Sequence, residues 1–399
     1  MNYLEKLLQG APVEWKTLGE VCDFQNGFAF KSSLFKETGL PIIRITNVNG
    51  KTVDLSDLKY FDPNDYQKGN PLNYSIHKGD ILVAMSGATT GKLGYYNHEK
   101  PAYLNQRVGK FIPNSSKLNN KYLYHFLLSK TEFLYTLAGG GAQPNLSSTD
   151  IKEKIKIPIP PLPVQKEIAR ILDAFTAITS ELTSELTLRQ KQYQHYRDKL
   201  LTFGDEVEWK TLGEVAKKIS SGGTPKTDRA EYYGGSIPWL RTQEVNFGEI
   251  WDTGVKITEE GLKNSSAKLI PKNCVIIAMY GATVGRVGIN KIPLTTNQAC
   301  ANIELDNTIL NYRYLFHYLS NRYEYIKSLG AGSQTNINAK IVKNLQIPIP
   351  PIEEQKRIAG ILDKFHTLAH SLSEGLPKEI ALRQKQYAYY RDLLLGFEK

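Results

Sequence analysis

IPIPPLPVQKEIARILD at Ile157–Asp173 and IPIPPIEEQKRIAGILD at Ile347–Asp363 are nearly the same sequence, 190 residues apart. Prolines cannot sit inside a helix or a central strand, so each run predicts an extended boundary. Apolar residues spaced three and four apart follow the prolines, and this spacing predicts a long helix. The chain therefore contains two copies of one unit, an extended segment that leads into a helix.

Other segments repeat in the same order around these two stretches. They are VEWKTLGEV at 13–21 and 207–215, GATTGKLG at 87–94 and GATVGRVG at 281–288, GGGAQPNLS at 139–147 and GAGSQTNIN at 330–338, and LRQKQYQHYRD at 188–198 and LRQKQYAYYRD at 382–392. An ordered series of matches at offsets of 190 to 194 residues indicates an internal duplication. Each half is predicted to be a globular segment followed by a helix.

The composition is that of a globular protein. Of 399 residues, 41% are hydrophobic and 23% are charged, which argues against a disordered or fibrous chain. The net charge of +10 suggests a polyanionic partner, and it divides as +6 in residues 1–203 and +4 in residues 204–399. Three separated cysteines favour a reduced, cytoplasmic chain. Neither a signal peptide nor an apolar run of 18 residues is present, so we expect no membrane association.

Short β-like runs and one tyrosine-rich helix are expected in each half. The runs are LPIIRIT at 40–46, DILVAMSG at 80–87 and NCVIIAMYG at 273–281, and the helices are KYLYHFLLS at 121–129 and YRYLFHYLS at 312–320. The predicted fold class is α+β. It comprises two pseudo-symmetric mixed α/β domains joined by two long helices that pack as an antiparallel coiled coil, with the domains inverted at its ends.

A mostly apolar seam with steps of three and four residues supports the coiled coil. It follows Ile168, Ile171, Phe175, Ile178, Leu182, Leu186, Arg189, Tyr193, Tyr196, Leu200 and Phe203, and then Ile358, Ile361, Phe365, Leu368, Leu372, Leu376, Ile380, Arg383, Tyr387, Tyr390, Leu394 and Phe397. In the second helix, Gly375 and Pro377 predict a kink. The N-terminus resembles the tail of a missing helix, because LEKLLQGAPVEWK is similar to RDKLLTFGDEVEWK at the junction.

These features resemble the specificity subunit of Type I restriction-modification systems over the whole chain. PIPPLPVQKEIARILD and PIPPIEEQKRIAGILD are the clearest motifs, and SGGTPKT with YYGGSIPWLRTQEV, within Ser221–Val245, is similar to the opening of a target recognition domain. The LRQKQYxxYRD helices and TSELTSEL look most like the IC-type branch. The resemblance implies an N-terminal helix at 1–12 that completes the second helical region, recognition domains at 13–156 and 205–346, and helical regions at 157–204 and 347–399.

The resemblance also implies a function. The chain would be a non-catalytic subunit that binds double-stranded DNA and reads a bipartite target with an unread spacer. It would bind two methyltransferase subunits that use S-adenosylmethionine to methylate adenine N6. Restriction subunits that use ATP and Mg²⁺ would join them.

Candidate DNA contacts are polar side chains on loops, since such groups bond base edges and phosphates. They are Gln25, Asn26, Lys31, Arg44, Asn47, Ser86, Thr89, Lys92, Asn105, Gln106 and Arg107 in the first domain, and Ser221, Thr224, Lys226, Arg241, Gln243, Tyr280, Thr283, Arg286, Asn297 and Gln298 in the second. For any one of these residues, an ordinary role in a solvated loop or turn is as good an interpretation as a DNA contact. Asn105 and Asn297 occupy equivalent positions in the two copies, so we expect them to have a structural role or to contact phosphates. Base reading is expected where the copies differ.

The polar positions of LRQKQYxxYRD are candidates for partner binding, because a coiled-coil seam needs only the apolar ones. They are Gln190, Lys191, Gln192 and Arg197, with Gln384, Lys385, Gln386 and Arg391 in the second copy. Recent duplication is the alternative explanation. The recognition domains have diverged widely, however, so we favour two equivalent docking sites.

Several catalytic interpretations fail. GATTGKLG has the wrong glycine spacing for a phosphate-binding loop, so it predicts a tight turn that can also meet DNA. His366 and His370 have metal-ligand spacing but no evident third ligand. No histidine pairs with a serine or cysteine motif, and the NPPY-like and FxGxG motifs of an adenine methyltransferase are missing. The alternatives left open are a stand-alone DNA methyltransferase or nuclease and a coiled-coil scaffold that does not bind DNA.

TSEL occurs twice in succession, at Thr179–Leu182 and Thr183–Leu186. One copy adds about 6 Å to a helix, which is comparable to the roughly 3.4 Å rise of one DNA base pair. We hypothesise that the number of copies sets the gap between the half-sites, although an ordinary stretch of surface helix is the alternative.

Overall fold

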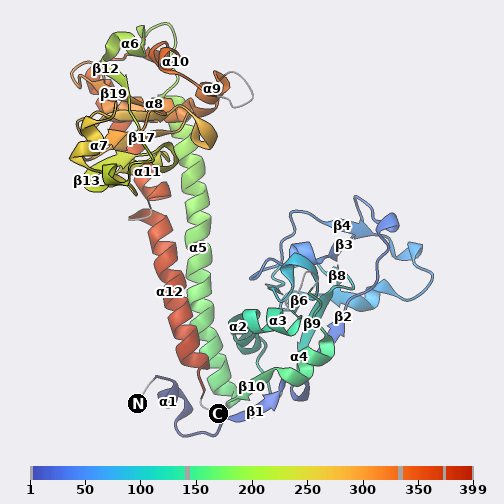
Figure 1. Ribbon diagram of the computed structural model, residues 1–399. Helices are drawn as coiled ribbons and strands as arrows, with labels where there is room; N and C mark the ends of the chain where they lie inside the picture. The colour runs from blue at the N-terminus through green and yellow to red at the C-terminus, as the bar shows by residue number, and fades with distance from the viewer. Residues whose placement is uncertain (1–2, 140–143, 331–335, 372–373, 398–399) are drawn as a thin grey trace. The chain divides into compact units, whose positions relative to one another are not determined.

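The computed structural model describes residues 3–139, 144–330, 336–371 and 374–397 (Figure 1). The chain divides into two compact units, Met1–Leu182 with Ile380–Lys399, and Thr183–Glu379. Each unit contains one mixed α/β domain and a part of the long helices.

The described residues of the first unit form a two-stranded ladder and two sheets. In the ladder, β1 (Glu14–Thr17) pairs antiparallel with β10 (Lys156–Ile159). One sheet has the order β2-β9-β6-β7, formed by Cys22–Asn26, Val108–Pro113, Ile81–Ala84 and Leu93–Tyr95. The other has the order β4-β3-β8-β5, formed by Lys59–Phe61, Leu40–Ile43, Ala102–Leu104 and Ser75–Ile76, and its β3–β8 pair is parallel.

Short helices complete the first unit. They are α1 (Tyr3–Leu8), α2 (Asn120–Ser129), α3 (Thr131–Leu137) and α4 (Ser148–Lys154). The tyrosine-rich α2 lies where the sequence predicts it, and its Tyr122 and Phe126 are buried in the same core as Ile81 and Ile168. Leu4 of α1 and Leu394 near the C-terminus belong to this core as well. The two ends of the chain therefore share one apolar cluster.

The second unit repeats this plan. β11 (Trp209–Thr211) pairs with β20 (Gln346–Pro348). One sheet has the order β12-β19-β16-β17-β14, formed by Ala216–Ser221, Cys300–Leu305, Val275–Ala278, Val287–Asn290 and Glu249–Ile250. The other has the order β15-β13-β18, formed by Lys256–Ile257, Tyr233–Leu240 and Thr295–Thr296. Its helices are α6 (Leu212–Val215), α7 (Glu259–Lys263), α8 (Tyr312–Asn321), α9 (Tyr323–Ser328) and α10 (Ala339–Lys343).

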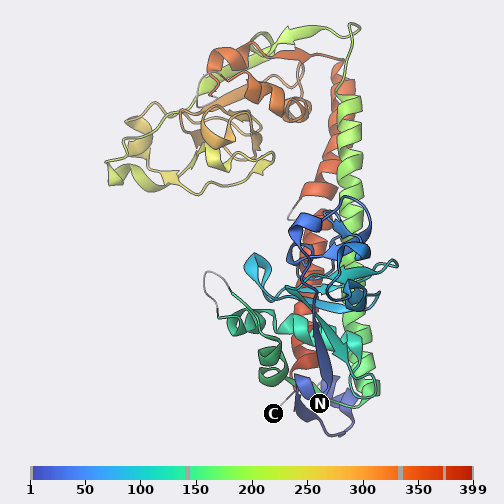
Figure 2. The same cartoon turned by 90° about the vertical axis from the view of Figure 1, so that its right-hand side faces the viewer.

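The long helices run antiparallel, as predicted. α5 (Leu162–Leu200) lies beside α11 (Ile352–His370) and α12 (Gly375–Leu395) in both ribbon views (Figures 1 and 2). In the first unit the rings of Phe175 and Tyr390 stack with centroids 5.1 Å apart. In the second, Tyr196 stacks on Phe365 at 5.4 Å. The residue number rises on α5 while it falls on its neighbour, which defines opposite directions.

The second long helix is interrupted rather than kinked. α11 ends at His370 and α12 begins at Gly375, whose φ of 74° is in the left-handed region that favours glycine. Pro377 lies in the first turn of α12, where a backbone N–H has no helical acceptor and its loss costs little. The predicted seam residue Leu372 lies outside the described residues.

The seam is buried at its ends and open at its centre. Ile168 and Tyr193 are buried, whereas Ile178 is 41% exposed. A pair of helices covers only one side of each seam residue, and full burial requires a domain on the other side. Leu172 and Leu362, which the seam pattern omits, are fully buried because they face the two domain cores.

A buried glutamine joins each extended boundary to its domain. Gln165 Oε1 accepts from the N–H of Asn119 at 2.8 Å, and its Nε2 donates to the carbonyls of Lys117 and Pro160 at 2.9 and 2.8 Å. Gln355 makes the equivalent bonds with Asn311, Ile309 and Pro350. Asn119 and Asn311 are the N-caps of α2 and α8. The repeated glutamine therefore fixes the start of each tyrosine-rich helix.

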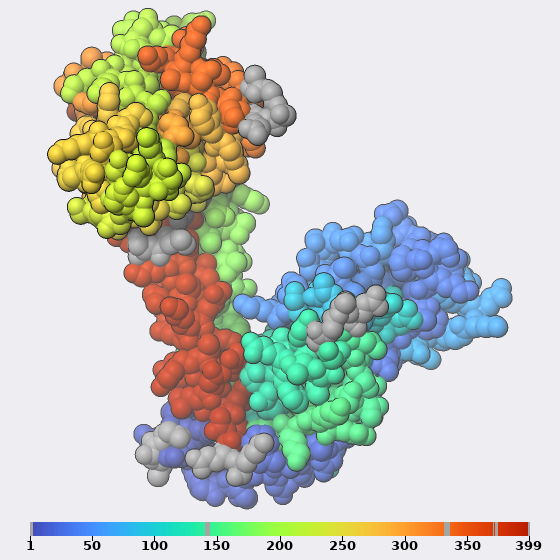
Figure 3. Space-filling view, in the orientation of Figure 1, coloured from blue at the N-terminus to red at the C-terminus, as the bar shows by residue number. Residues whose placement is uncertain are grey.

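A histidine in each tyrosine-rich helix contacts both long helices of its unit. His125 Nε2 lies 2.9 Å from Asp173 Oδ1 on α5, and α2 (turquoise) lies against α12 (red) in the space-filling view (Figure 3). His317 Nε2 lies 2.6 Å from Asp363 Oδ1 on α11. The repeated QKQY tyrosines, Tyr387 and Tyr193, approach the other ring nitrogen.

The pKa shifts of His317 and Asp363 indicate the protonation state of the contact in the second unit. Burial lowers the pKa of His317 more than the hydrogen bond to Asp363 raises it, so this imidazole is neutral at pH 7. Burial raises the pKa of Asp363, but hydrogen bonds from His317 and Arg313 outweigh it and leave that pKa below its usual value. The domain is thus held by a neutral histidine and an ionised aspartate.

Candidate nucleic-acid interface

Most candidate DNA contacts of the first domain follow strand ends that lie next to each other. Arg44 follows β3, and the N–H of Asn105 after β8 donates to the carbonyl of Ile43 at 3.0 Å. Beside them, the N–H of Met85 after β6 donates to the carbonyl of Arg107 at 2.9 Å. We call the set Asn26, Arg44, Ser86, Thr89, Lys92 and Asn105–Arg107 the first rim.

A glycine lets two segments of the first rim approach closely. A Cβ atom at Gly27 would lie 2.1 Å from the carbonyl oxygen of Asn105, so only glycine fits there. This approach brings Asn26, the last residue of β2, beside Asn105. Gln25, one residue earlier, donates to the carbonyl of Asn73 at 3.0 Å and is therefore tied to a neighbouring loop.

The segment GATTGKLG forms a tight turn after a strand, as predicted. Gly87–Thr89 is a short 3-10 turn, and Gly87 and Gly91 have φ values of 80° and 79°. Thr89 Oγ1 donates to the carbonyl of Ile45 at 3.0 Å, which attaches the turn to the segment after β3. Lys92 leaves the turn with an exposed side chain.

Arg44 and Asn47 shape the loop after β3. The Arg44 guanidinium forms an ion pair of 2.9 Å with Asp57. Asn47 is only 2% exposed, its Oδ1 accepts from the N–H of Arg44, and its Nδ2 donates to the carbonyls of Asp54 and Asp57. The hydrogen-bonding groups of Asn47 are thus used inside the protein, which gives this residue a structural role.

The second domain builds an equivalent rim. The N–H of Asn297 donates to the carbonyl of Leu240 at 2.9 Å, and the N–H of Met279 donates to that of Ala299 at 2.7 Å. A Cβ at Gly222 would lie 2.0 Å from the carbonyl oxygen of Thr296, so Ser221 sits close to Asn297. We call the set Ser221, Thr224, Arg241, Gln243, Tyr280, Thr283, Arg286, Asn297 and Gln298 the second rim.

Several side chains of the second rim are already engaged. Arg241 Nε lies 3.6 Å from Glu244, Arg286 donates to Asn246 Oδ1 at 2.9 Å, and Thr224 donates to Gln298. Thr283 is buried, while Gln243 and Tyr280 are exposed. Lys31 and Lys226 are exposed on loops, and no described contact ties either of them to its rim.

The candidate docking residues are partly used within the chain. Gln192 accepts from Arg189 at 2.8 Å and Gln386 from Arg383 at 2.9 Å. The guanidinium groups of Arg197 and Arg391 lie over the rings of Tyr193 and Tyr387, which brings them to the histidine contacts. The other four positions remain at the surface, with Lys191, Gln384 and Lys385 exposed and Gln190 half-buried.

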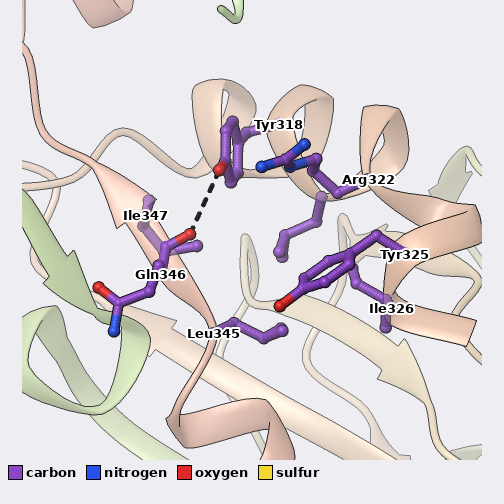
Figure 4. A pocket seen from close by; sticks show the side chains of 8 residues that line it. Tyr318, Arg322, Tyr325, Ile326, Leu345, Gln346 and Ile347 are labelled. Atoms are coloured by element: carbon purple, nitrogen blue, oxygen red, sulfur yellow. Dashed lines mark hydrogen bonds between the residues drawn. The ribbon is translucent and has the colours of Figure 1, made fainter. Parts of the chain in front are cut away.

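A small pocket in the second unit lies apart from the rim, between α8, α9 and β20. Figure 4 shows Arg322 between Tyr318 and Tyr325, and its guanidinium lies 5.9 and 5.5 Å from the two ring centroids. Tyr318 donates to the carbonyl of Gln346 at 3.3 Å. The Tyr318 hydroxyl and the Arg322 guanidinium thus both have partners within this pocket. Among the described residues, no cluster of metal-ligating side chains exists, and no helix is long and apolar enough to cross a membrane.

Sequence reasoning missed the residues that join each domain to its extended boundary and its long helices. His125, His317, Gln165 and Gln355 carry no catalytic or DNA-binding signature, so their patterns predicted no role. The available signal was their recurrence, since both histidines lie inside the tyrosine-rich helices and both glutamines inside the repeated proline motif.

Comparison with known proteins identifies the class. A profile of the Type I restriction modification DNA specificity domain matches residues 12–189 and, a second time, residues 204–382. The chain therefore belongs to the family of Type I restriction-modification DNA specificity proteins.

Individual relatives match over nearly their whole length. The chain is 37% identical over 417 residues to the Type I restriction enzyme EcoR124I/EcoR124II specificity subunit of Escherichia coli, covering 100% of this chain and 98% of the relative. It is 36% identical over 428 residues to a putative type I restriction enzyme specificity subunit of Haemophilus influenzae, with 99% and 98% covered. The crystal structure of a Type I S subunit from M. genitalium has the same fold, with a TM-score of 0.67, 18% identity and 100% of both chains covered.

Proposed function

We propose that this chain is the DNA-binding specificity subunit of a Type I restriction-modification complex and that it reads a bipartite target with an unread spacer. The observation that carries this proposal is the pair of rims. Each is built from the same strand ends and the same backbone bonds, yet their side chains differ. Two similar frames with different polar groups suit two different half-sites.

The same proposal assigns the parts of the chain. Residues 13–156 and 205–346 are the target recognition domains, and residues 157–204 and 347–399 are the helical regions, with residues 1–12 completing the second. The exposed rim residues, together with Lys31 and Lys226, contact bases or phosphates. Their partly buried neighbours Gln25, Arg44, Thr89, Asn105, Thr224, Arg241, Arg286 and Asn297 fix the loops and meet the phosphates.

The chain itself is non-catalytic in this proposal. Two methyltransferase subunits would bring S-adenosylmethionine and methylate adenine N6, and restriction subunits would bring ATP and Mg²⁺. The complex would work in the cytoplasm, where the DNA lies. The paired LRQKQYxxYRD motifs favour the IC-type branch.

Docking of the methyltransferases is proposed on the two LRQKQYxxYRD segments. The exposed Lys191 and Lys385 lie at equivalent positions, and so do the exposed apolar side chains Leu188 and Leu382. An apolar residue beside polar ones is typical of a protein interface. Because both copies present the same groups, two copies of one partner fit them.

The test is to co-express the chain with the methyltransferase subunit of its own system and to map methylated adenines. We expect one motif with two defined halves and a fixed unread gap. The purified chain alone, incubated with DNA and labelled S-adenosylmethionine or with Mg²⁺, should neither methylate nor cleave, and activity there would favour the stand-alone enzyme. A complex without salt-dependent DNA binding would favour the scaffold.

A further inference from the structure

Ser86 and Tyr280 occupy the same place in the two rims. Each follows a buried strand, β6 or β16, and each precedes a short turn, Gly87–Thr89 or Gly281–Thr283. Ser86 is only 9% exposed, and its Oγ is buried without a hydrogen-bond partner among the described residues. Tyr280 is 40% exposed. One rim is therefore recessed where the other carries a projecting aromatic ring.

At the adjacent position, Arg107 or Ala299, the large exposed side chain belongs to the first rim and the small buried one to the second. Arg107 and Ala299 are held by the same backbone bond, from the N–H of Met85 or of Met279, which are the residues before Ser86 and Tyr280. Arg107 is exposed, whereas Ala299 is buried. The first rim thus combines a small residue with a long cation, and the second combines a large aromatic residue with a small apolar one.

Arg107 differs from the other rim arginines in its freedom. Arg44 and Arg241 are paired with carboxylates and Arg286 with the Asn246 amide. Within the described part of the chain, no acceptor lies within bonding distance of the Arg107 guanidinium. An arginine that is already paired must break that contact before it can form a bidentate hydrogen bond with a base. Among the described residues, Arg107 has no such contact to break. Its five donors suit the O6 and N7 acceptors of guanine.

We infer that Arg107 reads a guanine in the first half-site and that Tyr280 takes over base reading at the equivalent position of the second rim. This inference rests on the proposed function. The Tyr280 ring makes an apolar contact with a base edge of the kind that a thymine methyl group offers. Ser86 is too short and too buried to compete with Arg107 for this base, and the buried Ala299 cannot compete with Tyr280.

The test is methylation mapping in cells that express the complex with R107A, R107K, Y280F or Y280S. R107A should relax the guanine at one position of one half-site, with a loss of discrimination on the order of 10- to 100-fold, and R107K should restore it only in part. Y280S should relax one position of the other half-site, while Y280F should retain the wild-type motif. R170A and Y325S remove an exposed arginine and an exposed tyrosine outside the rims, and both should keep the motif.

The possible failures can be told apart. If the wild-type complex methylates no bipartite motif, the proposed function fails. If the wild-type motif appears and R107A keeps it, or weakens methylation equally at all sequences as a phosphate contact would, the inference fails alone. A change of both half-sites by either substitution would also overturn it. If Y280F loses specificity, the Tyr280 hydroxyl rather than its ring recognises the base, and this result would contradict the apolar contact.

Discussion

The Nδ1 atom of His125 lies 3.1 Å from the hydroxyl of Tyr387, although the two residues are 262 positions apart in the sequence. The second unit repeats this relationship, with Nδ1 of His317 3.5 Å from the hydroxyl of Tyr193. In each unit an aspartate on the other long helix lies at the opposite ring nitrogen. In each unit one histidine thus contacts both long helices.

Removal of the Tyr387 hydroxyl should destabilise the first unit. Burial raises the pKa of Tyr387 to about 12, so the hydroxyl keeps its proton and its hydrogen bond over the ordinary pH range. Y387F leaves His125 Nδ1 without this partner and should cost about 1 kcal/mol. Thermal unfolding of the purified chain measures this loss. Y389F, at a position 65% exposed on the same helix, is the control, and equal melting temperatures for the two variants would contradict the prediction.

Acidification should weaken the second unit through His317. The pKa of this histidine is lowered in the folded chain, mainly by burial, so the unfolded chain binds more protons as the pH falls through about 6.5. Stability should therefore decrease from pH 7.5 to pH 5.5. The groups that face this imidazole are Asp363, Arg313, Tyr193, Arg197 and His366.

The measurement is the melting temperature at several pH values for the wild-type chain and for H317Q. The glutamine does not titrate, so part of the slope between pH 7.5 and 5.5 should disappear. H77Q, a substitution of a histidine in the first unit, should leave the slope in place. A steeper slope in H317Q than in the wild type would refute this explanation.

The buried glutamines should be among the least tolerant positions. Q165L removes three hydrogen bonds and leaves the N–H of Asn119 and two carbonyls without partners in the interior. Each unsatisfied buried group costs about 1–3 kcal/mol, so the first unit should unfold at a much lower temperature. Q194L changes an exposed glutamine on the same helix and serves as the control. Similar melting temperatures for the two variants would show that the bonds of Gln165 are dispensable.

The two TSEL copies should set the spacer. α5 is continuous through both, and the boundary between the compact units falls between Leu182 and Thr183. Deletion of Thr183–Leu186 shortens this helix by about 6 Å. The unread gap of the methylated motif should then shrink by roughly one to two base pairs, while both half-sites stay the same. T183A/S184A keeps the helix length and should keep the gap, and an unchanged gap in an active deletion complex would eliminate the hypothesis.

Part of the proposed interface could be predicted from residue type, and part could not. Arg107, Lys92, Gln243 and Tyr280 are exposed polar or aromatic side chains at loop positions, as expected of DNA contacts. Asn47 and Thr283 satisfied the same rule, but both are buried. A polar side chain after a strand can either point into solvent or form hydrogen bonds within its own loop. Only the path of the backbone decides between these two orientations.

The sequence by itself determined the duplication, the mixed α/β class, the tyrosine-rich helices and the antiparallel pairing of the long helices. Local spacing and repetition carry that information, because prolines exclude helix and apolar periods define buried faces. Only the tertiary structure decided that His125 meets Tyr387, that Gln165 fixes the start of α2 and that the second long helix is interrupted. The first two features join segments that are distant in the sequence, and no local pattern encodes the distance between side chains that folding brings together. The interruption depends on the left-handed backbone of a single glycine, Gly375.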